Sequence, residues 1–596
     1  MKRNKIIALA LAAGMTFCNV AATGIVAYAN ETTNTEGNAQ SQDEANESSD
    51  KNSTKKLKGQ TAVLTIENTG KTAHTFELYQ IFTGDLFIDG DKKTLSNIEW
   101  GASVDGTKYD ETAAKVAEKL STETNALTFA SELLSGQEPS PYKSIENVES
   151  GETARFENLP VGYYLVKDKD DSQNEAVDGA YTLYVLQIVG DADAKTKLSV
   201  PSSLKKVKEN TKAVNTDGTE TDDRISDFPL GEQYNDVADY SIGEAIPFKL
   251  AGTLPSNYDD YTKYSYKFVD TMSNGLTLNE DSVKVYFLSD KQSNNETPLT
   301  DNATIVKKEH ELTVTFDNLK NVTGITKDSI IVVEYDAKLN SGAVIGDDGN
   351  TNTFHLEYSN NPNGDGTGKT PEDKNIVFTY ELDNTKVTYI SVADYEKLSD
   401  TDKQAYTSAE YDLNNDGTVE SVYKKVLSGA KFKLYNAETG GNGAIIEDGK
   451  FVEWTNDAAK VTELTSDEKG LVKIAGLDSG TYYLDETEAP SGYNKLTKRV
   501  KITINATTVN DQNWNETAET TGTDKALTAL TVTLNDGSAI DGATSTGIVS
   551  TEIVNMPGAV LPSTGGVGTT VMYVIGGILV ICGGIAIFIK RKKDSE

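Results

Sequence analysis

An uncharged, mostly apolar run near the C-terminus, residues 571–589, is the strongest constraint on what this chain can fold into. At 1.5 Å per residue, a helix of about 20 residues spans the hydrocarbon core of a bilayer. The run is followed by Lys590-Arg591-Lys592-Lys593, and such charges hold the end of a membrane helix on the cytoplasmic side. The sequence therefore predicts a C-terminal transmembrane helix, with the residues before it on the outer side of the membrane.

The N-terminus, residues 1–29, has the pattern of a secretory signal peptide. The charged start Lys2-Arg3 is followed by an apolar stretch and by Ala27-Tyr28-Ala29, a small-x-small cleavage pattern. The two cysteines, Cys18 and Cys582, lie in this peptide and in the C-terminal run. The secreted part therefore has no cysteine, so disulfides cannot stabilise it as they do many extracellular domains.

The composition favours an extracellular structural protein over a nucleic-acid-binding one. The chain has 596 residues and a formal net charge of −35, so about three or four domains are expected once both ends are removed. A phosphate-binding surface needs clustered lysine and arginine, and we expect no nucleic-acid partner. The acidic excess is typical of a soluble, self-repelling surface protein.

Composition and periodicity divide the secreted part from its N-terminal side. Residues 30–56 contain almost no apolar side chain and cannot bury enough surface to offset the entropy of ordering, which predicts a disordered leader. Alternating apolar residues predict strands at 62–66 and 74–82. Residues 110–134 have helical spacing, which predicts a helical insertion. We assign the first domain to residues 57–200.

Two further β domains are expected before the C-terminal run. Residues 201–365 form the second domain and residues 366–557 the third, which has an insertion at 391–423. Strands are expected in the second domain at residues 264–269, 283–288, 312–316, 330–335 and 354–358. Many short strands separated by turn residues favour an all-β chain of tandem Ig-like β-sandwiches.

Five residues before the C-terminal run carry information that a simple membrane anchor does not need. They are Leu561, Pro562, Ser563, Thr564 and Gly565. With the apolar run and the basic tail, residues 558–596 resemble the LPXTG cell-wall sorting signal of Gram-positive surface proteins. The resemblance implies that a membrane sortase cuts between Thr564 and Gly565 and transfers the Thr564 carbonyl to an amine. It also implies a secreted protein that ends up anchored to peptidoglycan at the cell surface.

The motifs of common enzymes and metal sites are missing from the sequence. The three histidines are far apart, and no nucleophile elbow, zinc motif or phosphate-binding glycine loop occurs. Asp412-x-Asn414-x-Asp416-Gly417 matches the first half of a calcium loop, but Tyr423 stands where a bidentate glutamate is needed. We favour an acidic turn over a calcium site, and we expect no metal, no cofactor and no enzyme acting on external substrates.

Charged and amide residues nevertheless lie in phase with apolar strand residues in the last two domains. Side chains alternate between the two faces of a strand, so a polar residue in phase with apolar ones points into the core. Such a residue is costly to bury unless it pairs or reacts. The set in the third domain is Lys386, Glu486 and Asn555, and that in the second is Lys205, Asp270 and Asn352.

Longer motifs around these residues resemble pilins. Tyr482-x-Leu484-x-Glu486-Thr487-x-Ala489-Pro490-x-Gly492-Tyr493 is similar to the E-box of collagen-adhesin-B-type (CnaB-like) domains of Gram-positive pilins. Asp239-Tyr240-Ser241-Ile242-Gly243, with Val269-Asp270-Thr271 and Asn352-Thr353-Phe354, resembles the fimbrial D2 (CnaA-like) domain of backbone subunits. The resemblance implies a CnaB-like, a D2/CnaA-like and a second CnaB-like domain.

In that family, a lysine on the first strand of a domain forms an intramolecular isopeptide bond with an asparagine on the last strand, and an acid catalyses the reaction. Burial lowers the pKa of a lysine toward the nucleophilic amine and raises that of a carboxyl, which can then shuttle protons as ammonia leaves. The resemblance thus implies bonds Lys386–Asn555 with catalytic Glu486, and Lys205–Asn352 with catalytic Asp270. In the second domain, Lys206 and Lys208 are alternatives for the lysine.

The first domain departs from this pattern. Lys167 stands where the E-box glutamate would fall, and the closing strand at 181–189 has no asparagine, so we predict no bond there. Pilus backbones also carry a lysine between the first two domains, to which sortase joins the next subunit. Lys197 is our choice for that residue and Lys195 the second. The Tyr-Pro-Lys context often found in the family is absent from this linker.

Together these features predict the major (backbone) subunit of a sortase-assembled pilus. The implied partners are a pilus-specific sortase, a housekeeping sortase, identical subunits, ancillary pilins, peptidoglycan and host surface ligands. Two other readings stay open from the sequence. One is a singly anchored adhesin that binds a host ligand, and the other is an ancillary pilin at the tip or base.

Overall fold

The computed structural model of the chain describes residues 54–90, 92–119, 132, 139–196, 198–210, 234–362, 364–414, 416–509, 525–558, 572, 574 and 575. The predicted signal peptide and the leader before Thr54 lie outside these residues. Within them, no helix is long and apolar enough to cross a bilayer. The predicted transmembrane run lies outside the described residues except for three positions.

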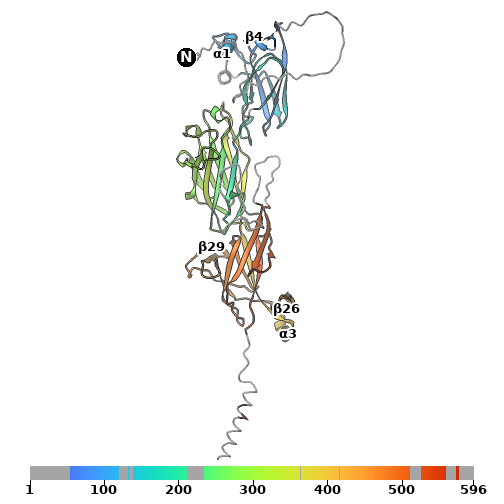
Figure 1. The fold of residues 1–596 in the computed structure, drawn as a ribbon, viewed down its shortest axis with the longest axis vertical. Helices are drawn as coiled ribbons and strands as arrows, with labels where there is room; N and C mark the ends of the chain where they lie inside the picture. The colour runs from blue at the N-terminus through green and yellow to red at the C-terminus, as the bar shows by residue number, and fades with distance from the viewer. Residues whose placement is uncertain are drawn as a thin grey trace, which may run out of the picture.

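Three β units follow one another along the long axis in chain order (Figure 1). Helix α1 (Ala113–Lys119) lies on the first unit, and α3 (Val392–Glu396) lies on the third, on its side away from the second. The all-β prediction is confirmed: each unit is a set of hydrogen-bonded strands around an apolar core. The helical insertion predicted at 110–134 is seen as α1, and most of residues 120–138 lie outside the description.

The first unit packs a six-stranded sheet against a three-stranded one. Apolar side chains that alternate along the strands of both sheets meet between them, including Leu64, Phe76 and Tyr164. The larger sheet comprises β1 (Thr54–Leu57), β3 (His74–Asp89), β4 (Lys92–Trp100), β5 (Lys143–Val148), β7 (Gly162–Asp168) and β8 (Leu183–Ile188). The smaller comprises β2 (Thr61–Glu67), β6 (Thr153–Pro160) and β9 (Ala192–Lys195).

Strand β1 corrects the predicted leader at its end. Residues 54–56 were expected to be disordered, but Lys55 and Lys56 pair with Ile88 and Phe87 of β3. The composition of this stretch is polar, so the local sequence gives no sign of the pairing. Backbone hydrogen bonds to the long strand β3 hold it instead.

The second unit is a sandwich of two seven-stranded sheets. One sheet comprises β10 (Ser203–Lys208), β11 (Tyr234–Asn235), β13 (Ala245–Thr253), β15 (Leu276–Leu278), β16 (Lys284–Leu288), β17 (Thr297–Pro298) and β20 (Ile330–Leu339). The other comprises β12 (Val237–Asp239), β14 (Tyr266–Met272), β18 (Thr304–Lys308), β19 (Glu311–Phe316), β21 (Asn350–Ser359), β22 (Thr367–Lys369) and β23 (Asp373–Phe378). The five strands expected in this domain correspond to β14, β16, β19, β20 and β21.

The second unit extends beyond its predicted end at residue 365. Strand β23 pairs antiparallel with β21 and parallel with β12, so the hydrogen-bonded sheet ends at Phe378. Ile376 and Phe378 also pack in the apolar core of the third unit, beside Tyr380 and Leu382. The two units are therefore joined by a shared apolar contact as well as by the chain.

The third unit is a 13-stranded hydrogen-bonded sheet wrapped around one core. Its strands are β24 (Tyr380–Ser391), β25 (Thr407–Tyr411), β26 (Glu420–Val426), β27 (Lys431–Tyr435), β28 (Gly443–Glu447), β29 (Lys450–Thr455), β30 (Leu464–Thr465), β31 (Leu471–Leu477), β32 (Gly480–Glu488), β33 (Val500–Thr508), β34 (Leu527–Leu534), β35 (Ile540–Asp541) and β36 (Ile548–Val554). The insertion predicted at 391–423 holds α3, α4 (Asp400–Lys403) and β25.

The first and last strands of the third unit are neighbours. Strands β24 and β36 run parallel in direct register, with Lys386 opposite Ile553 and Val387 opposite Val554. Parallel neighbours need a long crossover connection, and here almost the whole domain forms it. The chain therefore enters and leaves this domain along two adjacent strands.

Candidate functional site

The three residues predicted for the third domain meet in its core. Lys386 lies on β24, Glu486 lies on β32, and Asn555 directly follows β36. Each is about 1% exposed. Lys386 and Glu486 alternate in phase with the buried Leu382 and Leu484, so the period of the strands turns them inward.

Glu486 connects the other two residues. Its Oε1 atom lies 3.0 Å from Lys386 Nζ, and both carboxylate oxygens accept from Asn555 Nδ2, at 3.0 and 3.2 Å. Lys386 Nζ also contacts Asn555 Oδ1 directly. The backbone N–H of Leu496 donates to Glu486 Oε2 at 2.7 Å and fixes the carboxylate. The amine is thus held against the amide, with a carboxylate touching both.

Burial sets the protonation of this lysine. Desolvation lowers the pKa of Lys386, and the neighbouring Glu486 opposes that shift. A lower pKa favours the neutral amine, which is the nucleophilic form. The arrangement can support attack of Lys386 Nζ on the Asn555 carboxamide, with Glu486 placed to move protons.

The set in the second domain bridges the two sheets of the sandwich. Lys205 lies on β10 in one sheet, whereas Asp270 on β14 and Asn352 on β21 lie in the other. All three side chains are fully buried. Lys205 Nζ contacts Asp270 Oδ1. Burial lowers the pKa of Lys205, and Asp270 opposes the shift.

A fourth residue, Tyr335, belongs to this set and was not predicted from the sequence. Its hydroxyl lies 3.1 Å from Lys205 Nζ, donates to Asp270 Oδ2, and accepts from Asn352 Nδ2 at 2.7 Å. Tyr335 lies on β20, and its ring stacks on Phe248 with centroids 5.4 Å apart. A tyrosine on an apolar strand is usually a core residue, so its only signal was a polar group on an apolar face.

The structure separates Lys205 from its register alternatives. Lys206 points to the opposite face of β10 and forms a buried ion pair with Asp236. Lys208 is partly exposed, near the ring of Tyr234. Of the three lysines, Lys205 is the one in contact with Asp270. The buried Lys206–Asp236 pair was not predicted.

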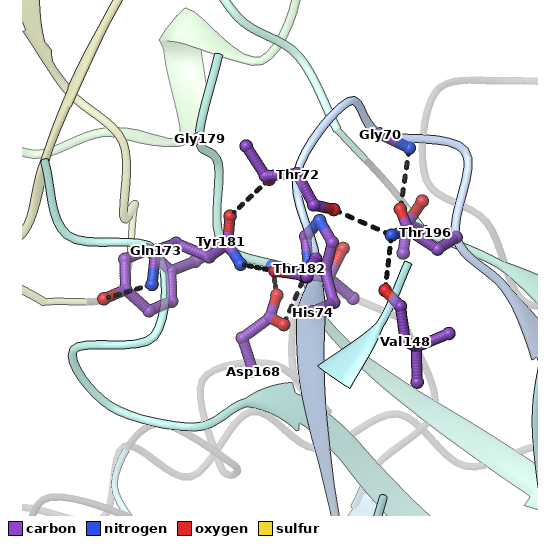
Figure 2. Close-up of polar contacts among 12 residues, drawn as sticks. Gly70, Thr72, His74, Val148, Asp168, Gln173, Gly179, Tyr181, Thr182 and Thr196 are labelled. Carbon is purple, nitrogen blue, oxygen red and sulfur yellow. Dashed lines mark hydrogen bonds and ion pairs between the residues drawn. The ribbon is translucent and has the colours of Figure 1, made fainter. Parts of the chain in front are cut away.

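The first domain holds a different buried polar pair. His74 Nδ1 lies 2.8 Å from Asp168 Oδ1, and Asp168 Oδ2 accepts from the backbone N–H of Thr182 at 2.6 Å (Figure 2). Burial raises the pKa of Asp168, and His74 opposes that shift. No lysine is among the buried residues described in this domain, and Lys167 pairs with Asp170. That this domain forms no isopeptide bond stays a prediction.

The first two domains are held together by hydrogen bonds on the side of this pair. The backbone N–H of Tyr181 donates to the Asn360 carbonyl at 3.0 Å, and Asn360 Nδ2 donates to the Gln173 carbonyl at 2.7 Å. Figure 2 shows Gln173 and Tyr181 near His74. These hydrogen bonds therefore join the same two domains that the linker with the predicted polymerisation lysine connects.

The structure describes only some of the residues predicted to react with sortase. Leu561, Pro562, Ser563, Thr564, Gly565 and Lys197 lie outside it. Lys195 ends β9 with a 69% exposed side chain, and its Nζ lies 2.7 Å from Glu67 Oε2. Glu67 also pairs with Lys195 in the β2–β9 ladder.

The half calcium loop forms a turn in the structure. Asp412 accepts from the backbone N–H groups of Asp416, at 3.0 Å, and of Gly417, at 2.8 Å. Its carboxylate thus serves the local backbone. Among the described residues, no group of three His, Cys, Asp or Glu side chains is placed to hold a metal ion.

Three segments of the chain match known protein families. Residues 242–362 match the Gram-positive pilin backbone subunit 2, Cna-B-like domain, and residues 417–518 match the SpaA prealbumin-like fold domain. Residues 556–596 match the LPXTG cell wall anchor motif. The chain therefore contains a domain of the Gram-positive backbone pilins at residues 242–362 and a cell-wall anchor motif at residues 556–596.

Individual relatives include a streptococcal surface protein and solved pilins. The chain is 25% identical over 300 residues to the trypsin-resistant surface T6 protein of Streptococcus pyogenes serotype M6, and this alignment covers 48% of the chain and 47% of the relative. The chain thus spans about half the length of that relative. The solved T6 backbone pilin of serotype M6 Streptococcus pyogenes is 18% identical, with a TM-score of 0.46, covering 84% of this chain and 99% of that one. The major pilin SpaD from Corynebacterium diphtheriae is 15% identical, with a TM-score of 0.42, covering 84% and 98%.

The match to a Cna-B-like family covers most of the second domain. Asp270 and Asn352 lie inside this segment, and Glu486 lies inside the prealbumin-like one. The sequence predicted a D2/CnaA-like type for the second domain, whereas the matched family is described as Cna-B-like. The finer domain types therefore stay predictions.

Proposed function

We propose that this chain is the backbone subunit of a pilus in which a pilus-specific sortase joins the Thr564 carbonyl of one subunit to the Lys197 amine of the next. Two autocatalytic isopeptide bonds, Lys386–Asn555 and Lys205–Asn352, stabilise each subunit. The housekeeping sortase then attaches the fibre to peptidoglycan. Each subunit is a substrate of sortase, and its own chemistry is a single turnover within the folded chain.

One observation carries this proposal: Lys386 on the first strand of the third domain and Asn555 after its last strand are buried in contact with each other and with Glu486. A buried lysine and carboxylate are expensive to desolvate, and an amide beside them gives the lysine something to react with. Reaction replaces the amine and the carboxamide by a neutral secondary amide with release of ammonia. Glu486 is not consumed in this reaction, and its role is to move protons between the reacting groups.

The location of the bond suits a fibre under tension. Load enters the third domain along β24 and leaves along β36, and the two reacting residues are 169 positions apart in sequence. A covalent link between them carries the load past the remaining strands. Closing a loop of that length also restricts the unfolded chain, worth about 5 kcal/mol on the loop-entropy model.

The second domain is protected in a different way. Lys205 and Asn352 lie on opposite sheets of the sandwich, so a bond between them joins the sheets through the core. The secreted chain has no cysteine that could do the same. An isopeptide bond needs no oxidant and supplies the staple that a disulfide provides elsewhere.

The test is the intact mass of the secreted chain from Asn30 to Thr564, together with the size of the protein released from cell walls. Each bond expels one ammonia, about 17 Da, and denaturation does not reverse the change. We expect a deficit of two ammonias and a ladder of covalent polymers that survives SDS. A mass equal to the sequence contradicts the internal bonds, whereas a single wall-released band contradicts polymerisation and favours a singly anchored adhesin.

A further inference from the structure

The two buried lysine sites differ in what lies between the reacting groups. In the third domain, Asn555 Oδ1 accepts directly from Lys386 Nζ. In the second domain, Asn352 Oδ1 is buried and has no hydrogen-bond partner among the described residues, and Asn352 Nδ2 donates to Tyr335. The tyrosine hydroxyl lies between the acid, the amine and the amide.

We propose that Tyr335 is a catalytic residue of isopeptide formation in the second domain and relays a proton from Asp270 to the departing nitrogen of Asn352. The inference rests on the proposed function, because it concerns the same bond. It is carried by three contacts of one hydroxyl: with Lys205 Nζ at 3.1 Å, with Asn352 Nδ2 at 2.7 Å, and with the Asp270 carboxylate.

The difference in acid length explains why a relay is needed here. In the third domain the longer Glu486 reaches Asn555 Nδ2 with both oxygens and needs no intermediary. Aspartate is one methylene shorter, and Asp270 makes its contacts with Lys205 and with the Tyr335 hydroxyl. Asp270 and Tyr335 together thus span the distance that Glu486 spans alone.

The reaction balances without any external reagent. The neutral amine of Lys205 attacks Asn352 Cγ, a C–N bond forms, and the amine gives up a proton to the Asp270 carboxylate. Asp270 then passes a proton to the Tyr335 hydroxyl while that hydroxyl passes its own proton to Nδ2. The Cγ–Nδ2 bond breaks, ammonia leaves, and Asp270 and Tyr335 return to their starting states.

The tyrosine stays protonated before and after this exchange. Burial and the neighbouring Asp270 hold the pKa of Tyr335 well above its usual range. The phenol therefore does not act as a base in its own right. It acts by accepting one proton as it donates another, which its simultaneous contacts with Asp270 and Asn352 allow.

The site also keeps the tyrosine in place. Its ring stacks on Phe248, whose ring lies 5.0 Å below Lys205 Nζ. Phe248 and Tyr335 face each other in the β13–β20 ladder. The position of the Tyr335 hydroxyl is therefore fixed by two paired strands, which belong to the same sheet as the strand of Lys205.

The test follows bond formation in the secreted chain during cell-free synthesis, by mass spectrometry of the cross-linked peptides. The variant is Tyr335→Phe. Loss of a proton-transfer group costs typically about 10²-fold or more in rate, so the Lys205–Asn352 peptide is expected to form at least about 100-fold more slowly. The Lys386–Asn555 peptide in the same molecules serves as an internal clock and is expected to form at the wild-type rate.

Two further variants separate chemistry from packing. Tyr264→Phe removes another fully buried hydroxyl of the same core, one without a hydrogen-bond partner in the described structure, and is expected to leave both bonds unchanged. Adding Asp270→Glu to Tyr335→Phe gives the acid the reach of Glu486 and is expected to restore the slowed bond. Recovery also shows that the tyrosine variant can fold.

Several outcomes overturn the proposal. Wild-type kinetics for Tyr335→Phe exclude a relay, and failure of the double variant to recover makes Tyr335 a packing residue. A wild-type chain with no Lys205–Asn352 peptide at any time contradicts the proposed internal bond itself. This result differs from a failure of the Tyr335 proposal alone, which is seen only when the wild-type chain does form the Lys205–Asn352 bond.

Discussion

Lys386, in the middle of β24, touches Asn555, which directly follows the adjacent parallel strand β36: Lys386 Nζ contacts Asn555 Oδ1, and the backbone N–H of Asn555 donates to the carbonyl of Val387 at 2.9 Å. The side-chain contact is therefore held by the backbone ladder that joins β24 to β36. The two groups are placed by the fold, so the reaction needs no binding step and gains the advantage of proximity.

Removing the acid from this site is expected to prevent the bond in the third domain. Glu486→Gln keeps the size of the side chain but cannot accept and return a proton. The deficit relative to the variant's own sequence mass is therefore expected to fall from two ammonias to one, a change of about 17 Da. Loss of the closed loop is expected to lower the free energy of unfolding of this domain by about 5 kcal/mol. Intact mass and thermal unfolding measure the two effects together.

A matched control, Glu488, lies on the same strand, β32. Its 63% exposed side chain pairs with Lys431 at 2.7 Å, and an exposed ion pair contributes little to stability. Glu488→Gln is expected to keep the deficit of two ammonias and to shift unfolding slightly. A Glu486→Gln chain that still lacks two ammonias excludes Glu486 as the acid.

Two neighbouring lysines of β10 are expected to respond differently to substitution. Lys205→Met removes the amine, so this chain is expected to lack one ammonia rather than two relative to its own sequence mass. Lys206→Met is expected to keep the deficit of two ammonias, but it deprives the buried Asp236 carboxylate of its cation. Breaking a buried pair typically costs about 3–5 kcal/mol, so the Lys206 variant is expected to unfold at lower denaturant while it still carries both bonds.

The opposite result for these two variants assigns the reacting lysine to position 206 instead of 205. A Lys206→Met chain that lacks the bond, beside a Lys205→Met chain that keeps it, contradicts the assignment of Lys205. The amount of cross-linked peptide containing Asn352 distinguishes the two directly.

The junction of the second and third domains is expected to weaken as the pH rises. Burial raises the pKa of Asp478 well above its usual range, and the nearby Asp239, Glu209 and Glu244 carboxylates add to the shift, opposed by a hydrogen bond from Asn210. Burial also raises the pKa of Asp239 and of Glu244. In the folded chain these groups hold their protons at higher pH than in the unfolded chain.

Proton linkage gives the direction in which stability changes with pH. The folded state binds more protons than the unfolded state between the unfolded pKa of about 3.9 and the raised folded values, so stability falls as the pH rises through that window. Asp478→Asn removes one of these charges and is expected to stabilise the junction at pH 7 but not near pH 4. Thermal unfolding from pH 4 to 8 measures the difference, with the exposed Asp536→Asn as control.

Periodicity was sufficient to predict that Lys386 and Glu486 point into the core, whereas the grouping of residues into two reacting sets came from the resemblance to pilins. Lys386 and Glu486 stand in phase with buried leucines along their strands, and strand alternation depends only on local sequence. The all-β class followed from the same signal. What the alternation could not supply is which faces meet, since the pairing of strands across a sandwich is set by packing between distant segments.

The residues that were missed share that long-range origin. Tyr335 looks like any core tyrosine until β20 is placed opposite β14 and β21, and Asp236 meets Lys206 only once β11 and β12 are positioned. The strand β23 was placed in the third domain because a glycine-rich stretch precedes it, but its partners are β21 and β12. Local turn signals mark where the chain bends and not which sheet it joins.

The linker lysine is expected to decide whether polymers form. The backbone of Lys195 belongs to the β2–β9 ladder, and its amine pairs with Glu67 at 2.7 Å. Lys197 follows β9 in the sequence. In a strain carrying the matching pilus sortase, Lys197→Ala is expected to reduce the SDS-resistant ladder to a single wall-attached band, and Lys195→Ala is expected to retain the ladder. Thr564→Ala serves as the reference, because it removes the acyl donor and so both the ladder and wall attachment. A ladder lost with Lys195→Ala and kept with Lys197→Ala reverses the assignment, and a ladder kept in both variants places the acceptor amine outside this linker.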